Sequence, residues 1–489
     1  MKREEFGMYR DYGLLIDGVW RGAADGGTRE VLDPCTEEII GFIPAAREAD
    51  LDAALASAQV GFRTWRATSP WERSRILRRA ADLIRSRAEV IGRIMSTETG
   101  KPLAQAVGET NDAADQYEWY AGETQRIYGQ TIESRLPEVR MQVRYEPVGV
   151  VAAFSAWNFP ALLPSRKIAA ALAAGCSIIV KPASEAPGSC MAVVQALMEA
   201  GVPAGVVNVV TGDSSLISEY LVRSPIVAKV TLTGSTGIGR RMLQLAADGI
   251  KRVTMELGGH APVLVFEDAD VDYAAEQCAR FKYRNCGQVC ASPSRFYVHA
   301  SIYDDFCKRF AEVTRSLKVG PGLDPDTAVG PMANRRGLDH ARELIADALQ
   351  RGSRLLAGGD RPSHIAGAKG YFLAPTALAD VPDDAKIMQL EPFAPVAPIA
   401  SFETFDEAIA RANSTPYGLA SYLFSRSLKT ATLASEAIHA GMVGVNELAI
   451  ASAEMPFGGV GASGMGREGG SLGIRDYLEA KFIKTRLQA

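Results

Sequence analysis

The sequence predicts an α/β fold built around a parallel, doubly wound sheet. From Pro147 onward, short runs rich in β-branched residues show little polar alternation, as expected of strands buried on both faces. Helical stretches separate these runs, and glycines stand where two of the helices should end. Such alternation of strands and helices is typical of a parallel sheet covered by helices on both faces.

An amino-terminal helical region precedes this sheet. One helix is expected over about residues 50–65. The segment Ser69-Pro70-Trp71-Glu72 has the pattern of a capping box, with Ser as N-cap, Pro at the first helical position and Glu three residues after the cap. Apolar residues at helical spacing continue from there to Ile94. These helices are expected to serve packing, and no chemistry is assigned to them.

The expected strands of the sheet are residues 148–154, 177–180, 206–210, 227–232 and 253–256. The helices between them are expected near residues 165–174, 188–200, 214–223 and 237–247, with Gly175 and Gly201 as C-terminal caps. A second α/β region begins after residues 262–266 and runs to about residue 460.

Charge and cysteine content exclude several classes of protein. Lys plus Arg is 53 and Asp plus Glu is 57, so the net charge of −4 provides no electrostatic surface for nucleic acid or an anionic membrane. Seven cysteines cannot all pair, which excludes a disulfide scaffold and favours reduced thiols in the cytoplasm.

Membrane, secretion and metal signals are also missing from the sequence. The longest uncharged apolar run, residues 168–180, is shorter than the about 20 residues of a membrane span. The charged start Met1–Glu5 does not resemble a secretory signal. The five histidines lie at no ligand spacing from one another or from a cysteine pair, so we predict no metal.

Two segments suit a phosphate or a nucleotide. Residues 233–239 form a glycine-rich turn between a strand and a helix, where free N–H groups attract phosphate, although the spacing is not the usual dinucleotide fingerprint and a plain turn is as good an explanation. Lys181 ends a buried strand and faces the crevice where ligands bind, unless it only reaches into solvent. Ser184 follows in place of an acidic residue, so a ribose 2′-phosphate is not repelled and NADP stays open beside NAD.

Three further segments carry reactive groups. Cys290, in Asn285-Cys286-Gly287-Gln288-Val289-Cys290, offers a thiol nucleophile, although a single cysteine is more often a core residue. Glu256 ends an apolar strand, where a carboxylate is either paired or a general base. Asn158, in Trp157-Asn158-Phe159-Pro160, carries an amide that could hold an oxyanion, or belongs to an ordinary turn.

Taken together, the order and spacing of these motifs resemble the aldehyde dehydrogenase superfamily, most closely its succinate-semialdehyde dehydrogenases. The matching segments are Glu98-Thr99-Gly100-Lys101, Trp157-Asn158-Phe159-Pro160, Lys181-Pro182, Gly234-Ser235-Thr236, Glu256-Leu257-Gly258-Gly259, Gln288-Val289-Cys290, Glu391-Pro392-Phe393 and Pro456-Phe457-Gly458-Gly459. The resemblance implies a Rossmann-type parallel-sheet cofactor domain, an α/β catalytic domain and a small β oligomerisation element.

The resemblance also implies a mechanism. Cys290 attacks the aldehyde as a thiolate, Asn158 holds the oxyanion, and hydride passes to NAD or NADP. Glu256 then activates water to hydrolyse the thioester, with Glu468 assisting the relay of protons. The cofactor-binding residues implied in the same way are Trp157, Lys181, Ser184, Gly234, Ser235, Leu257, Glu391 and Phe393. Cys286, four residues before the nucleophile, is expected to serve packing.

Substrate class follows from three residues at positions that bind the distal carboxylate in succinate-semialdehyde dehydrogenases. These are Arg166, Arg284 and Ser452, and a planar guanidinium suits a carboxylate because it binds both oxygens. Structural ion pairs are the alternative explanation for the two arginines. The alternative substrate is glutarate semialdehyde or a related ω-oxo acid. A CoA-acylating dehydrogenase is disfavoured because those relatives generally lack the Glu256 base.

The expected division of the chain is a dinucleotide-binding domain over residues 1–125 and 146–257, a catalytic domain over 258–460, and a bridging element over 126–145 and 461–489. Alternating residues in 126–145 look like a projecting hairpin. Because a projecting hairpin has open edges that need a partner, a homodimer or homotetramer is expected.

Overall fold

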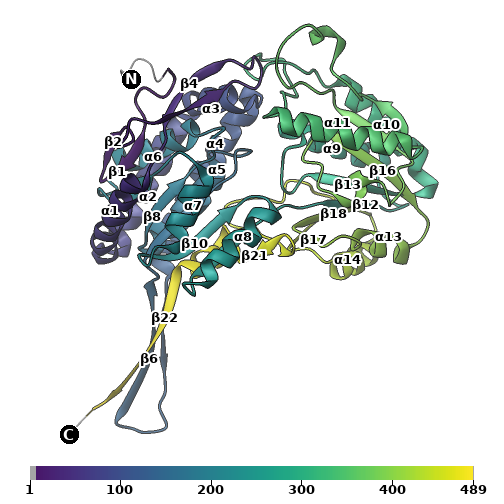
Figure 1. The fold of residues 1–489 in the computed structure, drawn as a ribbon. Helices are drawn as coiled ribbons and strands as arrows, with labels where there is room; N and C mark the ends of the chain where they lie inside the picture. The colour runs from purple at the N-terminus through teal and green to yellow at the C-terminus, as the bar shows by residue number, and fades with distance from the viewer. Residues whose placement is uncertain (1–6, 488–489) are drawn as a thin grey trace.

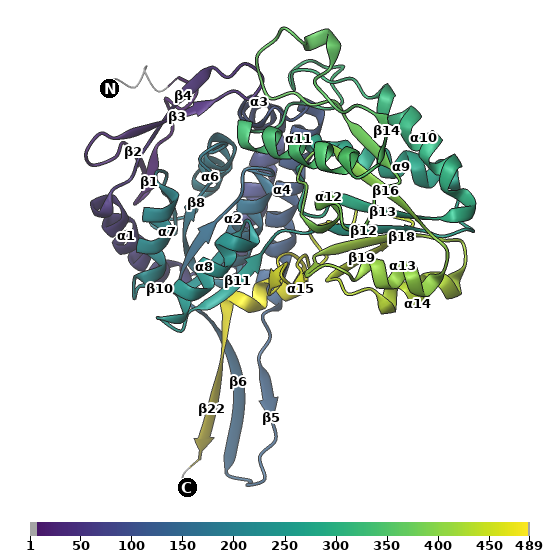
Figure 2. The ribbon, with the colours of Figure 1, turned by 45° about the vertical axis from the view of Figure 1, so that its right-hand side comes forward.

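The computed structural model describes residues 7–487, and the charged start Met1–Glu5 lies outside this range. Two α/β bodies lie side by side, and a long hairpin projects away from them (Figures 1 and 2). Each body contains its own mixed sheet. The two largest buried cores lie between these sheets and the helices that cover them. Within residues 7–487, no helix combines the length and the apolar character that a membrane crossing requires.

The predicted parallel sheet is confirmed as the centre of an eight-stranded sheet in the order β2-β1-β9-β8-β7-β10-β11-β21. Its parallel strands are β7 (Val150–Phe154), β8 (Ser177–Lys181), β9 (Val207–Val209), β10 (Val227–Thr233) and β11 (Arg252–Glu256). Antiparallel strands complete the edges: β1 (Leu14–Ile16), β2 (Val19–Arg21) and β21 (Gly464–Met465). The chain order along the parallel strands reverses beside β7, where ligands bind in such sheets.

The crossover helices are α5 (Leu162–Ala174), α6 (Gly188–Ala200), α7 (Ser214–Arg223) and α8 (Thr236–Ala247). Gly175 and Gly201 cap two of them with φ of 98° and 103°, as predicted. Helix α5 begins before the predicted residue 165. Its first turn contains Pro164, which needs no N–H partner at a helix start.

The four amino-terminal helices are α1 (Glu48–Ala67), α2 (Pro70–Ser86), α3 (Ala88–Thr99) and α4 (Leu103–Glu123). Helix α1 packs on strands β8 and β9 of the sheet, whereas α2, α3 and α4 pack against α5 and α6. The Ser69 side chain accepts a hydrogen bond from the Glu72 N–H, which is half of the predicted capping box. The helical pattern that runs on to Ile94 is broken at Arg87, which ends α2 and begins α3. The apolar spacing continues across this turn, so the sequence did not reveal the break.

The second body holds a seven-stranded sheet in the order β14-β15-β16-β13-β12-β18-β19. The strands are β12 (Ala261–Val265), β13 (Pro293–His299), β14 (Arg354–Ala357), β15 (Thr376–Ala379), β16 (Val396–Phe402), β18 (Ala420–Phe424) and β19 (Met442–Val445). Its helices are α9 (Val271–Tyr283), α10 (Tyr303–Ser316), α11 (Arg335–Gln350), α12 (Lys386–Gln389), α13 (Phe405–Ala412) and α14 (Leu428–Ala437).

Short strands form two separate antiparallel pairs: β3 (Thr28–Leu32) with β4 (Ile39–Pro44), and β17 (Tyr417–Gly418) with β20 (Val460–Gly461). A short helix, α15 (Gly470–Gly473), lies near the C-terminal end of the chain.

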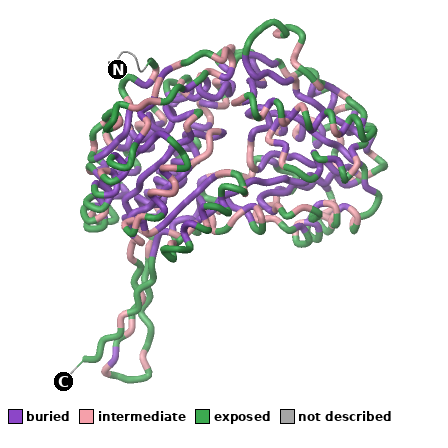
Figure 3. Tube along the Cα trace, viewed as in Figure 1, coloured by how far each residue is buried: buried purple, intermediate pink, exposed green. Residues whose placement is uncertain are grey.

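The projecting sheet consists of β5 (Gln130–Ile132), β6 (Val139–Pro147) and β22 (Leu478–Arg486). Strand β22 pairs with β6 along its whole length, from Leu478 opposite Pro147 to Arg486 opposite Val139. Most of this sheet is exposed in the single chain (Figure 3). Within the range 461–489 assigned to the bridging element, β21 instead joins the eight-stranded sheet by pairing with β11.

Candidate active site

A cavity of about 290 Å³ lies where the two bodies meet. Its walls come from α4, from the start of α5, from the loop before β13 and from the loop after β19. Cys290 and Tyr422 stand on the wall, together with Phe159 and Phe457. The cavity therefore brings side chains from distant parts of the chain around one thiol.

Cys290 is half-buried on a sharply turned loop. The turn comes from three successive residues with positive φ, which are Asn285 (49°), Cys286 (55°) and Gly287 (70°). A Cβ at Gly287 would stand 2.2 Å from the Ala394 carbonyl oxygen, so this position requires glycine. Cys286 is buried beside the Met332 sulfur at 3.7 Å, as its predicted packing role requires.

The Cys290 thiol faces the Glu256 carboxylate. Burial first, and then this carboxylate, raise the pKa of the thiol well above its usual value, while Arg166 opposes the shift. The raised pKa favours the thiol form of Cys290 over the thiolate. A neighbouring base would help to form the thiolate.

Glu256 ends β11 and is fully buried. Neither of its carboxylate oxygens has a hydrogen-bond partner among residues 7–487. Burial and the nearby Glu468 carboxylate raise the pKa of Glu256. A buried carboxylate without partners is costly to keep charged, and a raised pKa suits a general base that takes up a proton.

Glu468 lies near Glu256 and forms a buried ion pair with Lys167. The Lys167 ammonium also donates to the Thr233 hydroxyl at 2.7 Å, and the Thr231 hydroxyl donates to Glu468 at 3.3 Å. Lys167 was not singled out from the sequence. Its pairing partner is 301 residues away, so no local pattern reveals it.

Asn158 follows β7 and is buried directly behind the thiol loop. Its side-chain amide donates to the Gln288 carbonyl at 3.2 Å, and its side-chain oxygen has no partner among residues 7–487. An amide nitrogen has two N–H groups, so one donor remains for an oxyanion next to Cys290.

The candidate phosphate site lies at the start of α8. Ser235 is the N-cap of this helix. Apart from the chain neighbours and the helix's own backbone, no atom of residues 7–487 lies within 4 Å of the place where a Cβ on Gly237 would stand. Gly234 donates its N–H to the Glu256 carbonyl at 3.0 Å, and the Leu257 side chain packs against Gly239. The open helix N-terminus fits a pyrophosphate.

The candidate ribose groups lie at the ends of neighbouring segments. Lys181, at the end of β8, approaches the Ser184 hydroxyl at 3.4 Å, and burial lowers the pKa of Lys181 to about 8. Glu391 accepts a hydrogen bond from the Gly259 N–H at 3.1 Å, and burial raises the pKa of Glu391 to about 8.

Trp157 and Phe393 pack edge to face with ring centroids 5.5 Å apart. Aromatic, acidic and basic groups thus surround the open helix end, a donor set that fits a dinucleotide.

The three candidate substrate residues Arg166, Arg284 and Ser452 line the same cavity as Cys290. Neither arginine forms an ion pair with any residue in 7–487, so the structural ion-pair explanation is wrong. The Arg166 guanidinium lies 4.2 Å from the Phe457 ring centroid, and its Nε has no partner in the same range. The Arg284 guanidinium lies 5.9 Å from the Phe159 ring centroid.

Acidic residues border this cavity, but within residues 7–487 none lies within ion-pair distance of Arg166 or Arg284. Asp112 lies on the wall, where burial raises its pKa and Arg284 opposes the rise. Asp115 pairs with Arg85 at 2.6 Å. Two guanidinium groups therefore remain available for an anion in the cavity. In the part of the chain that the structure describes, no group of three or more His, Cys, Asp or Glu could hold a metal ion.

Comparisons with known proteins agree with this geometry. The model of the aldehyde dehydrogenase family matches residues 20–483. A glutarate-semialdehyde dehydrogenase of Pseudomonas putida is 42% identical over 96% of both chains. A succinate-semialdehyde dehydrogenase (NADP+) of Escherichia coli is 41% identical over 99% of both chains. The crystal structure of a succinate-semialdehyde dehydrogenase from Burkholderia pseudomallei superimposes with a TM-score of 0.95 at 41% identity, covering 97% of this chain and 98% of that one.

Proposed function

The chain belongs to the aldehyde dehydrogenase family, and from this premise we propose that it oxidises succinate semialdehyde to succinate with NAD or NADP. The observation that carries the substrate class is that two arginines, which form no ion pair within residues 7–487, share one cavity with a thiol. A guanidinium binds both oxygens of a carboxylate, so an aldehyde with an acidic far end suits this cavity.

The first step is the attack of Cys290 on the aldehyde. Glu256 takes the thiol proton, and the thiolate forms a C–S bond while the carbonyl electrons move onto oxygen. The free amide N–H of Asn158 and the backbone N–H of Cys290 donate to that oxyanion. When bound, a nicotinamide cofactor supplies the acceptor for the hydride that leaves the substrate carbon.

The second step is hydrolysis of the thioester left on Cys290. Once the thiol proton has left Glu256 through Glu468, Glu256 takes a proton from water while the water oxygen bonds to the acyl carbon. The C–S bond then breaks, which leaves the Cys290 thiolate and releases the acid. Glu468, which is paired with Lys167, lies close enough to Glu256 to raise the pKa of Glu256. The Glu468 charge therefore favours the protonated form of Glu256. We include Glu468 in the mechanism as the group that passes this proton on.

Cofactor binding in the proposal rests on the residues around the start of α8. Ser235 and Gly234 meet the pyrophosphate, and Lys181 and Glu391 hold the two riboses. The remaining contacts come from Trp157, Ser184, Leu257 and Phe393. The Escherichia coli relative is named for NADP, and the neutral Ser184 beside Lys181 supports the same cofactor here.

The proposal includes a homodimer or homotetramer in the cytoplasm. Phe482, in the projecting sheet, is 59% exposed. Among residues 7–487, β22 and β5 are the edge strands of that sheet, and a partner can cover edge strands of this kind. All seven cysteines are free, which suits a reducing compartment. We also propose the division into a cofactor domain, a catalytic domain and a bridging element.

Glutarate semialdehyde is the second candidate substrate, because the Pseudomonas putida relative is named for it. Succinate semialdehyde and glutarate semialdehyde differ by one methylene group. A binding pocket discriminates between two such substrates by a free-energy difference of only about 1–3 kcal/mol. A CoA-acylating reaction is disfavoured by Glu256, which serves the hydrolytic step.

The test is a spectrophotometric assay of reduced cofactor. NAD and NADP are each supplied with succinate semialdehyde, glutarate semialdehyde and butyraldehyde, with and without CoA. We expect the acidic aldehydes to give the highest kcat/KM, free acid as product without CoA, and no turnover in Cys290→Ala. Full activity of Cys290→Ala would refute the proposed mechanism.

A further inference from the structure

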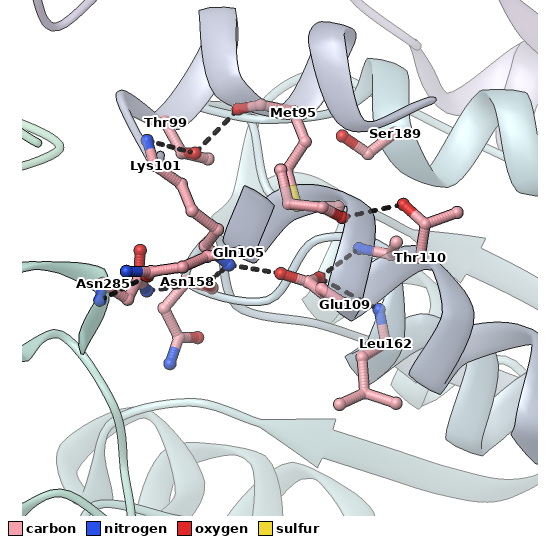
Figure 4. Close-up of polar contacts among 12 residues, drawn as sticks. Met95, Thr99, Lys101, Gln105, Glu109, Thr110, Asn158, Leu162, Ser189 and Asn285 are labelled. Atoms are coloured by element: carbon pink, nitrogen blue, oxygen red, sulfur yellow. Dashed lines mark hydrogen bonds and ion pairs between the residues drawn. The ribbon is translucent and has the colours of Figure 1, made fainter. Parts of the chain in front are cut away.

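A fully buried ion pair joins Lys101 and Glu109 behind the active site (Figure 4). Their side chains are 1% and 0% exposed. Lys101 follows α3, and Glu109 lies in α4. Neither residue lines the cavity, and the proposed reaction uses neither.

Lys101 holds the loop that carries Asn158. Its ammonium donates to the Asn158 backbone carbonyl at 2.8 Å and lies 4.1 Å from the Phe159 ring centroid. The Lys101 backbone is itself fixed, because its carbonyl accepts from the Ser96 hydroxyl at 2.6 Å and its N–H donates to Thr99 at 3.2 Å. The ammonium therefore connects a rigid turn to the oxyanion residue.

Glu109 holds the other end of the same loop. Its Oε1 accepts hydrogen bonds from the backbone N–H groups of Ala161 at 2.9 Å and Leu162 at 3.2 Å. These residues begin α5, which has no side-chain cap of its own. A carboxylate at this position satisfies two free N–H groups and complements the helix dipole.

Gln105, one turn before Glu109 on α4, holds the loop of the nucleophile. Its side-chain oxygen accepts from the Asn285 N–H at 2.9 Å. Residues four apart lie on the same face of a helix, so this face of α4 contacts both catalytic loops. Figure 4 shows Gln105, Glu109 and Lys101 converging between Asn158, Asn285 and Leu162.

The energetics favour orientation over stability as the purpose of the pair. Removing two charges from water costs several kcal/mol per ion, and well-packed apolar residues often stabilise such a site equally well. Burial indeed lowers the pKa of Lys101, and Glu109 opposes that shift. Apolar replacements would fill the space, but they could not bind a carbonyl and two N–H groups at fixed positions.

We propose that Lys101 and Glu109 are positioning residues that set the Asn158 amide relative to Cys290, with Gln105 aligning the nucleophile loop from the same helix face. This inference rests on the proposed function, because it assumes that Asn158 holds an oxyanion.

The test compares two reactions of the same thiol. Oxidation of the aldehyde forms an oxyanion next to Asn158, whereas alkylation of Cys290 by iodoacetamide displaces iodide at a saturated carbon and forms none. In Lys101→Met/Glu109→Gln, which removes both charges together, we expect kcat/KM for succinate semialdehyde to fall by about 10- to 100-fold. The alkylation rate constant should change by less than about threefold.

Two further variants complete the design. Gln105→Leu leaves the ion pair in place. As in the double variant, we expect it to lower the ratio of kcat/KM for oxidation to the rate constant for alkylation. Glu98→Gln is the matched control, because Glu98 is also a buried carboxylate that accepts from helix-start N–H groups, those of Gly188 and Ser189 in α6. Its ratio should stay at the wild-type value.

The inference would be overturned if the ratio of oxidation to alkylation stayed at the wild-type value in both the double variant and Gln105→Leu. This includes the case in which neither rate changes and the case in which both rates fall by the same factor. Failure of the proposed function is distinguishable, because the wild-type protein would then show no oxidation that depends on Cys290.

Discussion

The Asn285 side chain donates a hydrogen bond to the Asn158 backbone carbonyl at 2.9 Å, which joins the loop of the nucleophile to the loop of the oxyanion amide. The same amide donates to the Gln288 carbonyl within its own loop at 3.1 Å. Asn285 has a φ of 49°, a conformation that Asn adopts more readily than most residues. The two halves of the proposed site therefore form one hydrogen-bonded unit.

Replacing this side chain should loosen the unit. Asn285→Gly keeps the positive φ accessible and removes both side-chain hydrogen bonds. We expect the free energy of unfolding to fall by about 1–3 kcal/mol, and kcat/KM to fall by at least about tenfold. Urea denaturation and steady-state kinetics measure the two effects. Wild-type kcat/KM in this variant would show that the connection has no role in catalysis.

The carboxylate of Glu256 should control the ionisation of the thiol. Because burial and then this negative charge raise the pKa of Cys290, Glu256→Gln removes one cause and lowers that pKa. The pH profile of alkylation by iodoacetamide should shift to lower pH in Glu256→Gln, while turnover is lost with the base. A profile that stays in place or moves to higher pH would contradict the contact between the two groups.

Arg284 should select for acidic aldehydes. In Arg284→Ala, the preference for succinate semialdehyde over butyraldehyde in kcat/KM should fall by about 2–3 kcal/mol, or about 30- to 150-fold. Arg280→Ala is the control, because Arg280 lies on the surface of α9 and pairs with Glu276. Equal losses for both aldehydes in Arg284→Ala would make Arg284 a structural residue.

Lys181 should make cofactor binding depend on pH. Burial lowers the pKa of Lys181 to about 8, so its ammonium is charged below that pH and neutral above it. A charged donor forms the stronger hydrogen bonds, so the Kd of NADP should rise as the pH increases through about 8. Fluorescence titration checks this, and Lys181→Met should bind weakly with a flat profile over the same range. A flat wild-type profile would exclude Lys181 as a charged contact.

Much of the fold and site could be predicted because the relevant signals are local. Buried β-branched runs marked the parallel strands, and parallel strands bring their carboxyl ends together, which is why Lys181 and Glu256 share one edge. The motif order then indicated the family.

Other features could not be predicted because they depend on distant contacts. Glu109 is a polar residue inside a helix, and the sequence around it gives no sign that its side chain binds the backbone of residues 161 and 162. Lys167 and Glu468 are 301 residues apart. The absence of ion pairs at Arg166 and Arg284 within residues 7–487 likewise became visible only in three dimensions.

The central claim is that oxidation of the acidic aldehyde proceeds through a thioester on Cys290. Intact-mass spectrometry tests this directly, with Glu256→Gln mixed with succinate semialdehyde and NADP. This variant lacks the base for hydrolysis, while the lowered pKa of its Cys290 lets the thiol ionise without that base. We expect one succinyl group per chain, located by peptide mapping at Cys290 and missing in Cys290→Ala/Glu256→Gln. Cofactor reduction without an adduct, or an adduct on another cysteine, would contradict it.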